Sequence, residues 1–144
     1  MTRNNQFDLQ DFLPYLLAQA ADVTSLGFQQ YYKARYGMLR TEWRVLFHLG
    51  RYGQMTAKDI CTRAHIHKTK VSRAVAALET KRFLNREQST NDRRVETLWL
   101  TRTGTAAFQD LLAEAQRYDA KIMANFTEDE QVVLRRCLSK IADV

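Results

Sequence analysis

The side chains best suited to contact a polyanion lie between His65 and Thr101 of this 144-residue chain. One basic run, HKTKVSR, begins at His67, and a second, NDRR, ends at Arg94. Lys and Arg hold phosphates, and Arg, Lys, Ser and Thr can also reach the edges of bases. Three interpretations are open at this point: a nucleic-acid interface, a metal site or a solvated surface.

The net charge of +6 is concentrated around these two runs. Residues 63–102 hold ten Lys and Arg against four Asp and Glu, a difference of +6. The rest of the chain holds the remaining twelve basic and twelve acidic residues, which cancel. A basic stripe confined to one module is typical of polyanion binding.

The composition predicts one ordinary globular domain. Apolar residues make up 45% of the chain, and there are one Pro and five Gly, which argues against disorder. No apolar run reaches the length of a membrane span, and the first residues, MTRNNQFDLQ, contain no apolar signal segment. We therefore expect a cytoplasmic protein, in which Cys61 and Cys137 are buried or half-buried thiols.

Two helices are predicted before the basic stretch. The first spans Pro14 to Tyr36 and stops at Gly37. Its apolar residues wrap widely around the helix, which indicates packing against a partner chain. The second has Thr41 as its N-cap and ends near Gly50 or Gly53.

A winged helix-turn-helix is predicted from Thr56 onward. Thr56 and Asp59 form a capping-box pattern for a short helix that breaks near residues 65–66. The next helix carries an apolar stripe at helical spacing, made of Val71, Ala74, Val75 and Leu78. The pattern then changes to period two, with FLNREQ and VETLWL as two strands around the turn STNDRR.

Two more helices follow the strands. Thr101 is predicted to cap a long helix that runs to about Asn125, and Thr127 with Glu130 forms a capping box for the last helix. The fold class expected is therefore mainly α with a small β-wing, with about six helices.

In a helix-turn-helix, the second helix lies in the major groove and its N-terminal residues reach the bases. An Arg at the tip of a wing can enter the minor groove. Asp92 is expected to orient Arg94 or Arg73 through a bidentate pair. The predicted DNA-binding residues are His67, Lys68, Thr69, Lys70, Ser72, Arg73, Arg93 and Arg94.

The sequence resembles the MarR family of bacterial transcriptional regulators, nearly end to end from about Phe12 to Ile141. The resemblance is carried by LRTEWRVL, HKTKVSRAVAALETKRFLNR and DRRVETLWLTRTG. The last of these matches the family's Asp-x-Arg wing followed by Leu-Thr-x-x-Gly.

The resemblance implies an intertwined homodimer. Residues 1–40 would hold an N-terminal dimerisation helix, 41–101 the winged DNA-binding domain and 102–144 two C-terminal dimerisation helices. It also implies a pseudopalindromic operator whose half-sites lie about one turn of DNA apart. Many members of the family are repressors that release DNA when a small, often aromatic and anionic, effector binds.

Arg82 departs from the family pattern, because the family usually has Gly at this position. Glycine would end the helix with a positive φ, which costs an arginine roughly 1 kcal/mol. Either the helix ends differently here or Arg82 adopts the strained conformation, and the extra cation could add a phosphate contact.

An aromatic effector pocket could form where the first two helices meet. It would be lined by Phe28, Tyr31, Tyr32, Trp43 and Phe47, with Arg44 to balance a carboxylate. The alternative is that these side chains belong to the core and the dimer interface.

Other functions find less support in the residues. Cys61, His65, His67 and His48 match no strong zinc signature. A thiol-based redox sensor is an alternative, but the family's peroxide sensors carry their cysteine on the first helix, where this chain has none. An architectural protein that binds any DNA is a second alternative. No catalytic triad or phosphate loop appears, so neither an enzyme nor a cofactor is predicted.

Overall fold

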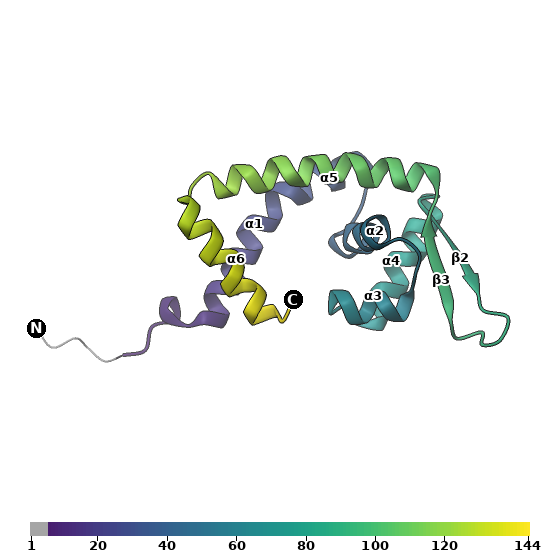
Figure 1. Ribbon diagram of the computed structural model, residues 1–144, viewed down its shortest axis with the longest axis horizontal. Helices are drawn as coiled ribbons and strands as arrows, with labels where there is room; N and C mark the ends of the chain where they lie inside the picture. The colour runs from purple at the N-terminus through teal and green to yellow at the C-terminus, as the bar shows by residue number, and fades with distance from the viewer. Residues whose placement is uncertain (1–5) are drawn as a thin grey trace, which may run out of the picture.

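The computed structural model describes residues 6–144, so residues 1–5 of the predicted N-terminal segment lie outside the described part. The described chain forms six α-helices, one short 3-10 helix and three strands (Figure 1). In chain order these are η1 (Leu9–Asp11), α1 (Leu13–Tyr36), α2 (Arg40–Tyr52), β1 (Met55–Thr56), α3 (Ala57–Ala64), α4 (Lys68–Thr80), β2 (Leu84–Gln88), β3 (Glu96–Leu100), α5 (Arg102–Met123) and α6 (Glu128–Ala142).

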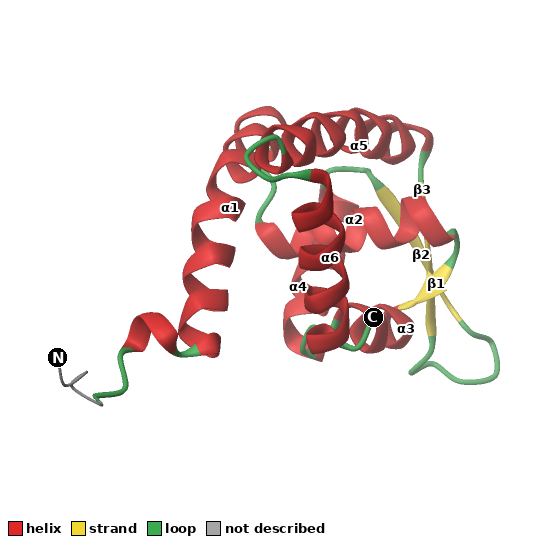
Figure 2. Ribbon diagram, turned by 60° about the vertical axis from the view of Figure 1, so that its left-hand side comes forward, coloured by secondary structure: helices red, strands yellow, loops and turns green. Residues whose placement is uncertain are grey.

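The helices divide into two groups joined by α5. In Figure 1, α5 runs along the top, with α1 and α6 descending from one end and α2, α3, α4 and the strands below the other. Figure 2, from a second direction, shows α1 standing apart from α2, α3 and α4. This arrangement is the mainly α fold with a small wing that the sequence predicted.

The predicted helix caps are confirmed at three of four positions. The hydroxyls of Thr56, Thr101 and Thr127 each accept the backbone N–H of the residue three positions on, at 3.0 to 3.2 Å. Helix α1 ends at Gly37 with a φ of 63°, a conformation that glycine adopts without steric cost. Helix α5 ends at Met123, two residues before the predicted end.

The predicted N-cap of α2 is wrong. Helix α2 begins at Arg40, so Thr41 lies inside its first turn and Leu39 occupies the cap position. Leucine has no polar side chain to accept a helix N–H. Instead, the Glu42 carboxylate accepts the backbone N–H of Leu39 at 2.8 Å, which gives this N–H, just ahead of the helix, a hydrogen-bond partner.

The wing contains three strands rather than the predicted two. Strand β3 lies between β1 and β2, and both neighbours are antiparallel to it. Strand β1 has only two residues, and Met55 and Thr56 pair with Leu98 and Thr97. Period-two alternation cannot be recognised in two residues, so only the pairing defines this strand.

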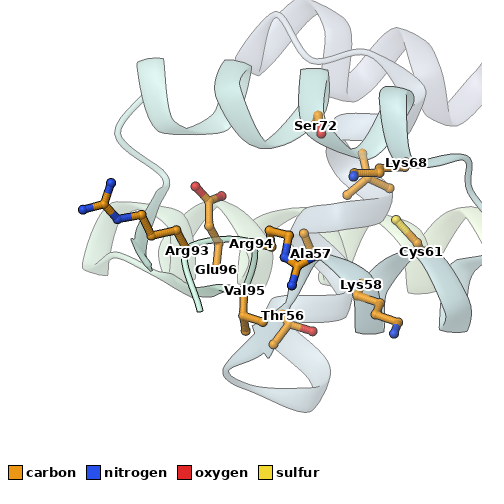
Figure 3. A pocket seen from close by; sticks show the side chains of 11 residues that line it. Thr56, Ala57, Lys58, Cys61, Lys68, Ser72, Arg93, Arg94, Val95 and Glu96 are labelled. Atoms are coloured by element: carbon orange, nitrogen blue, oxygen red, sulfur yellow. The ribbon is translucent and has the colours of Figure 1, made fainter. Parts of the chain in front are cut away.

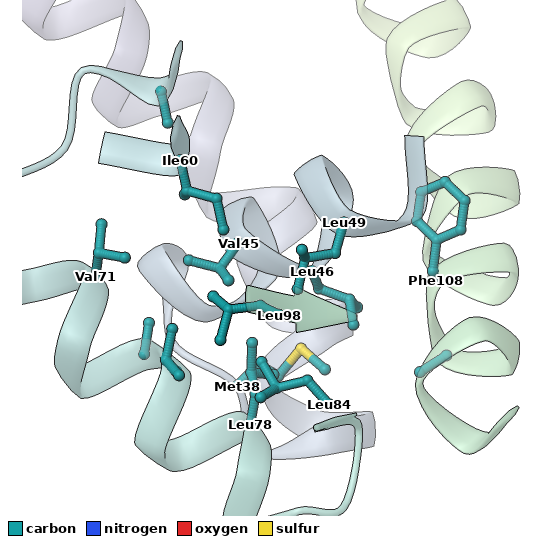
Figure 4. Packing of buried hydrophobic residues seen from close by; sticks show 14 of the residues in the cluster. Met38, Val45, Leu46, Leu49, Ile60, Val71, Leu78, Leu84, Leu98 and Phe108 are labelled. Atoms are coloured by element: carbon teal, nitrogen blue, oxygen red, sulfur yellow. The ribbon is translucent and has the colours of Figure 1, made fainter. Parts of the chain in front are cut away.

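One apolar core joins the helix-turn-helix to the sheet. The stripe of α4 predicted from its spacing is buried in full, from Val71 to Leu78. Figure 4 shows side chains of α2, α4 and the strands meeting in this core, with Phe108 of α5 at its edge. The largest side chains with almost no exposed surface include Tyr32, Met38, Leu46, Ile60, Leu78, Leu84 and Leu98.

A polar cluster joins α1 to α5. The Asp110 carboxylate accepts hydrogen bonds from the hydroxyls of Tyr31 at 2.9 Å and Tyr36 at 2.5 Å. It also pairs with the Arg35 guanidinium at 3.1 Å. The hydrogen bond from Tyr36 lowers the pKa of Asp110, and burial together with that bond raises the pKa of Tyr36 to about 12. Both groups therefore keep their roles as acceptor and donor near neutral pH.

None of the described helices is long and apolar enough to cross a membrane.

Candidate nucleic-acid interface

The turn between α3 and α4 positions the predicted recognition helix. His65 ends α3 with a φ of 53°, and Ile66 is buried at 7% exposure. His67 is the N-cap of α4, where its Nδ1 accepts the backbone N–H of Thr69 at 3.2 Å. The buried Ile66 and the two caps fix the direction in which α4 starts. The break predicted at residues 65–66 is confirmed.

All eight predicted DNA-binding residues are exposed to solvent. The buried stripe of α4 anchors one face of this helix, so its opposite face presents the polar side chains. Lys68, Thr69 and Lys70 make up its first turn, with Ser72 and Arg73 directly after. The arrangement offers cations, hydroxyls and a helix N-terminus on one surface, as a phosphate-bearing ligand requires.

The tip of the wing is shaped by Asp92. Its Oδ1 accepts the backbone N–H of Arg94 at 3.0 Å and the Nε–H of the same residue at 3.3 Å. One carboxylate oxygen takes both bonds, so the pair is not the bidentate pair that was expected, and Arg73 is not the partner. The Arg94 side chain remains 92% exposed, so its guanidinium is oriented yet open to a ligand.

Arg86 connects the wing to the recognition helix. Its guanidinium lies 3.0 Å from Glu79 at the end of α4 and 3.7 Å from Glu96 on β3. Two carboxylates therefore compensate this cation. Arg86 contributes to the basic window in the sequence, but in the fold it supports the wing.

A groove of about 700 Å³ separates the wing from α3 and α4. In Figure 3, Arg94 extends toward Ala57 across this groove, whereas the guanidinium of Arg93 points away. Its cationic side chains are Lys58, Lys68, Arg93 and Arg94, and Glu96 is its acidic one. Lys58 was missed in the sequence because it precedes the basic window, although its place in the first turn of α3 was a usable signal.

Arg82 adopts the strained conformation, which decides between the two alternatives left open by the sequence. Its φ is 62°, so α4 ends as a glycine at this position would allow. The Arg82 carbonyl oxygen accepts a hydrogen bond from the Thr101 hydroxyl at 2.7 Å. Packing around this turn therefore holds arginine where its own preference would not.

The predicted aromatic pocket forms in part. A hollow of about 510 Å³ between α1, α2 and α5 is lined by Phe28, Tyr32, Trp43 and Phe47. Phe28 and Trp43 meet edge to face with ring centroids 5.2 Å apart, as do Trp43 and Phe47 at 5.0 Å. The cation at this hollow is Arg40.

Two members of the predicted pocket lie elsewhere. Tyr31 belongs to the Asp110 cluster. Arg44 donates to the carbonyl oxygen of Ala64 at 2.7 Å, at the end of α3, and burial lowers the pKa of its guanidinium. Residue spacing along the sequence could not predict that Arg44 forms a hydrogen bond with the end of α3.

The cysteines and histidines do not gather into one site. No group of three or more His, Cys, Asp or Glu that could hold a metal ion occurs in residues 6–144. His48 contacts the carbonyl oxygen of Arg44 through Nδ1 at 2.6 Å. Cys61 is half-buried and lines the groove beside the wing. Cys137 is exposed, so the expectation of a buried or half-buried thiol is wrong there.

One known protein family resembles part of this chain. The model of the MarR family matches residues 36–95, which include the helix-turn-helix, β2 and the tip of the wing but not β3. Over these residues the chain is similar to the MarR family. The wing Asp-x-Arg expected from the resemblance lies at Asp92–Arg94, and Arg82 occupies a left-handed position.

The similar proteins include HTH-type transcriptional regulators. The HTH-type transcriptional regulator YwaE of Bacillus subtilis is 29% identical over 108 residues, covering 75% of this chain and 63% of YwaE. The HTH-type transcriptional repressor MdtR of the same organism is 28% identical over 106 residues, covering 74% of this chain and 68% of MdtR. The matched segment thus spans less than two thirds of YwaE.

The fold is shared with solved structures. BpsR of Bordetella bronchiseptica superposes with a TM-score of 0.86 at 20% identity, over 96% of this chain and 99% of BpsR. At that identity the likeness establishes the fold alone, which extends over the helices on both sides of the winged module.

Proposed function

We propose that this protein is a sequence-specific DNA-binding transcriptional regulator. The observation that carries the proposal is the cationic groove between α4 and the wing. The exposed Lys68 on the first turn of α4 and the oriented Arg94 on the wing flank this groove from two sides. A recognition helix in the major groove would place its lysines at base edges and phosphates, while the wing reached the adjacent minor groove.

The active form proposed is a homodimer. Apolar side chains are exposed along η1, α1 and α6, including Leu13, Leu16, Val132 and Leu138. Large apolar side chains exposed in such number along these helices mark an interaction site. Residues 1–40 and 102–144 would therefore form the dimerisation part and residues 41–101 the DNA-binding part. A two-fold dimer would bind a pseudopalindrome with half-sites about 34 Å apart.

Regulation by a small effector is the finer part of the proposal. The hollow beside Trp43 has aromatic walls, the cation Arg40 and the carboxylate of Asp119. Asp119 is ion-paired with Arg135, so Arg40 is left to balance a small aromatic anion. The DNA binding of BpsR is regulated by 6-hydroxynicotinic acid. MdtR is a transcriptional repressor, and repression is the regulatory sign proposed here.

Sequence selection from a random duplex pool at near-physiological salt tests this function. A sequence-specific dimer should enrich an inverted repeat. Binding without enrichment, weakened by added salt, would replace the proposal by an architectural role. No binding at all would remove the DNA interface, unless an aromatic carboxylate added to the selection restored it.

A further inference from the structure

Glu42 is a buried charge that the DNA interface does not explain. It is 4% exposed and is the single charged residue among the buried ones of the described chain. Its two oxygens have different partners. Oε2 accepts the Leu39 backbone N–H at 2.8 Å, and Oε1 accepts a hydrogen bond from the Lys81 ammonium at 2.8 Å.

Lys81 lies at the far end of the recognition helix from the residues predicted to reach bases. It directly follows Thr80, the last residue of α4, and its side chain is 26% exposed. The next residue, Arg82, is held through its carbonyl oxygen by Thr101, the N-cap of α5. The end of α4 is therefore fixed from α2 on one side and from α5 on the other.

Because α4 is long, a small change in angle at its anchored C-terminal end moves the N-terminal end that would contact bases. Helix α4 has 13 residues, which corresponds to a length of about 20 Å. A tilt of about 3° at one end of a helix that long displaces the other end by about 1 Å. Hydrogen bonds to base edges weaken steeply over such a shift, whereas flexible lysines can still reach phosphates.

We propose that Glu42 and Lys81 are positioning residues for sequence readout, because their partly buried ion pair sets the angle at which α4 meets DNA. The inference rests on the proposed function. A buried ion pair adds little net stability compared with apolar packing, but it accepts few alternative geometries. The competing role for Lys81 is that of one more cation near the phosphates.

The two roles predict opposite effects of Glu42→Gln. Glutamine can still accept the Leu39 N–H through its amide oxygen, but it cannot form the ion pair. If Lys81 only attracts phosphates, releasing it from Glu42 should strengthen binding to every duplex. If the pair positions α4, the preference for the selected sequence should fall.

The experiment measures the affinities of the full chain for two duplexes by fluorescence anisotropy. One duplex is the sequence that the wild type selects, and the other has a scrambled sequence. The variants are Glu42→Gln, Lys81→Met and the conservative Lys81→Arg. Lys140→Met on α6 is the control, because it removes the same charge from an exposed position, and size-exclusion chromatography establishes that this variant keeps the oligomeric state of the wild type. Circular dichroism establishes that each variant is folded at the assay temperature.

We expect Glu42→Gln and Lys81→Met to lower the ratio of the two affinities by about fivefold or more, as when one base contact is misplaced. Lys81→Arg and Lys140→Met should keep the ratio. An unchanged ratio in a folded Glu42→Gln variant, or tighter binding to both duplexes, would overturn the inference. If Lys81→Met does not fold, Glu42→Gln and Lys81→Arg decide.

The wild type separates this inference from the function on which it rests. If the wild type prefers no sequence, the proposed function is wrong and the positioning role falls with it. If the wild type prefers its selected duplex and Glu42→Gln keeps that preference, only the positioning role is wrong.

Discussion

The Thr101 hydroxyl donates a hydrogen bond to the carbonyl oxygen of Arg82 at 2.7 Å, across 19 positions of sequence. The same hydroxyl oxygen accepts the backbone N–H of Gly104 at 3.0 Å. One side chain thus starts α5 and also holds the turn that leaves the recognition helix. This double use gives a physical reason for the threonine of the Leu-Thr-x-x-Gly segment.

Thr101→Val should destabilise the protein by about 1–2 kcal/mol, because it removes a helix cap and the shorter of the two hydroxyl hydrogen bonds to the Arg82 carbonyl oxygen. Chemical denaturation followed by circular dichroism measures the change. Thr105→Val is the matched control, since the Thr105 hydroxyl bonds only within its own helix, to the Thr101 carbonyl. Equal losses for the two variants would argue against a special role for Thr101.

Gly104→Ala should be more damaging, at about 3 kcal/mol or more, because overpacking against a fixed backbone cannot relax easily. A Cβ at Gly104 would lie 1.8 Å from the carbonyl oxygen of Phe83. Gly37→Ala serves as the comparison, since that position has a φ of 63° but open space around it, and should cost about 1 kcal/mol. Thermal unfolding of both variants ranks the two effects, and a milder loss at Gly104 would contradict the packing.

Arg82→Gly should stabilise the protein by up to about 1 kcal/mol, since glycine adopts a φ of 62° without the steric cost paid by arginine. The unfolding midpoint measures this gain. The salt dependence of DNA binding tests the second role of Arg82 separately. If its cation contacts a phosphate, the slope of log K against log salt should fall by about 0.9 in the glycine variant.

The Asp110 cluster should make stability depend on acid pH. The pKa of the Asp110 carboxyl is lowered in the folded state, mainly by the hydrogen bond from Tyr36. The stability that the ionised Asp110 contributes is therefore present above the ordinary carboxyl pKa of about 3.9. It is lost as the pH falls through the lower pKa of the folded state. Asp110→Asn should thus be less stable than the wild type at pH 6, with the difference shrinking below about pH 4.

Unfolding by urea at several pH values measures the Asp110 effect. Asp119→Asn is a suitable control, because the ion pair of Asp119 with Arg135 is open to solvent, and it should differ from the wild type by less than about 1 kcal/mol. A difference at Asp110 that stays constant from pH 6 to pH 2 would exclude the carboxylate as its source.

Arg94→Ala should weaken binding to the selected duplex by about tenfold, or 1.4 kcal/mol, if the oriented guanidinium enters the minor groove. Asp92→Asn should give a smaller loss, because Arg94 keeps its charge but loses an acceptor at the tip of the wing. Gel-shift titration compares both with Arg117→Ala, which removes the same charge from α5. Affinity unchanged by Arg94→Ala would remove the wing from the interface.

Local patterns in the sequence predicted most of the elements. Helical spacing identified the buried stripe of α4, and the caps at Thr56, Thr101 and Thr127 were correct. These features depend on residues within one or two turns of each other, so periodicity and capping rules describe them well. The concentration of charge in residues 63–102 also pointed to the face that carries the groove.

Contacts between distant residues decided the rest. Strand β1 exists only because Met55 and Thr56 pair with β3. In the sequence Glu42 resembles an exposed helix residue, but in the fold its carboxylate pairs with Lys81. Arg44 does not line the aromatic hollow, because its guanidinium donates to the Ala64 carbonyl oxygen. The sequence by itself determined which segments are helices and where the positive charge lies. The tertiary structure alone decided which charges are compensated and which remain free for a ligand, because compensation depends on partners many residues away.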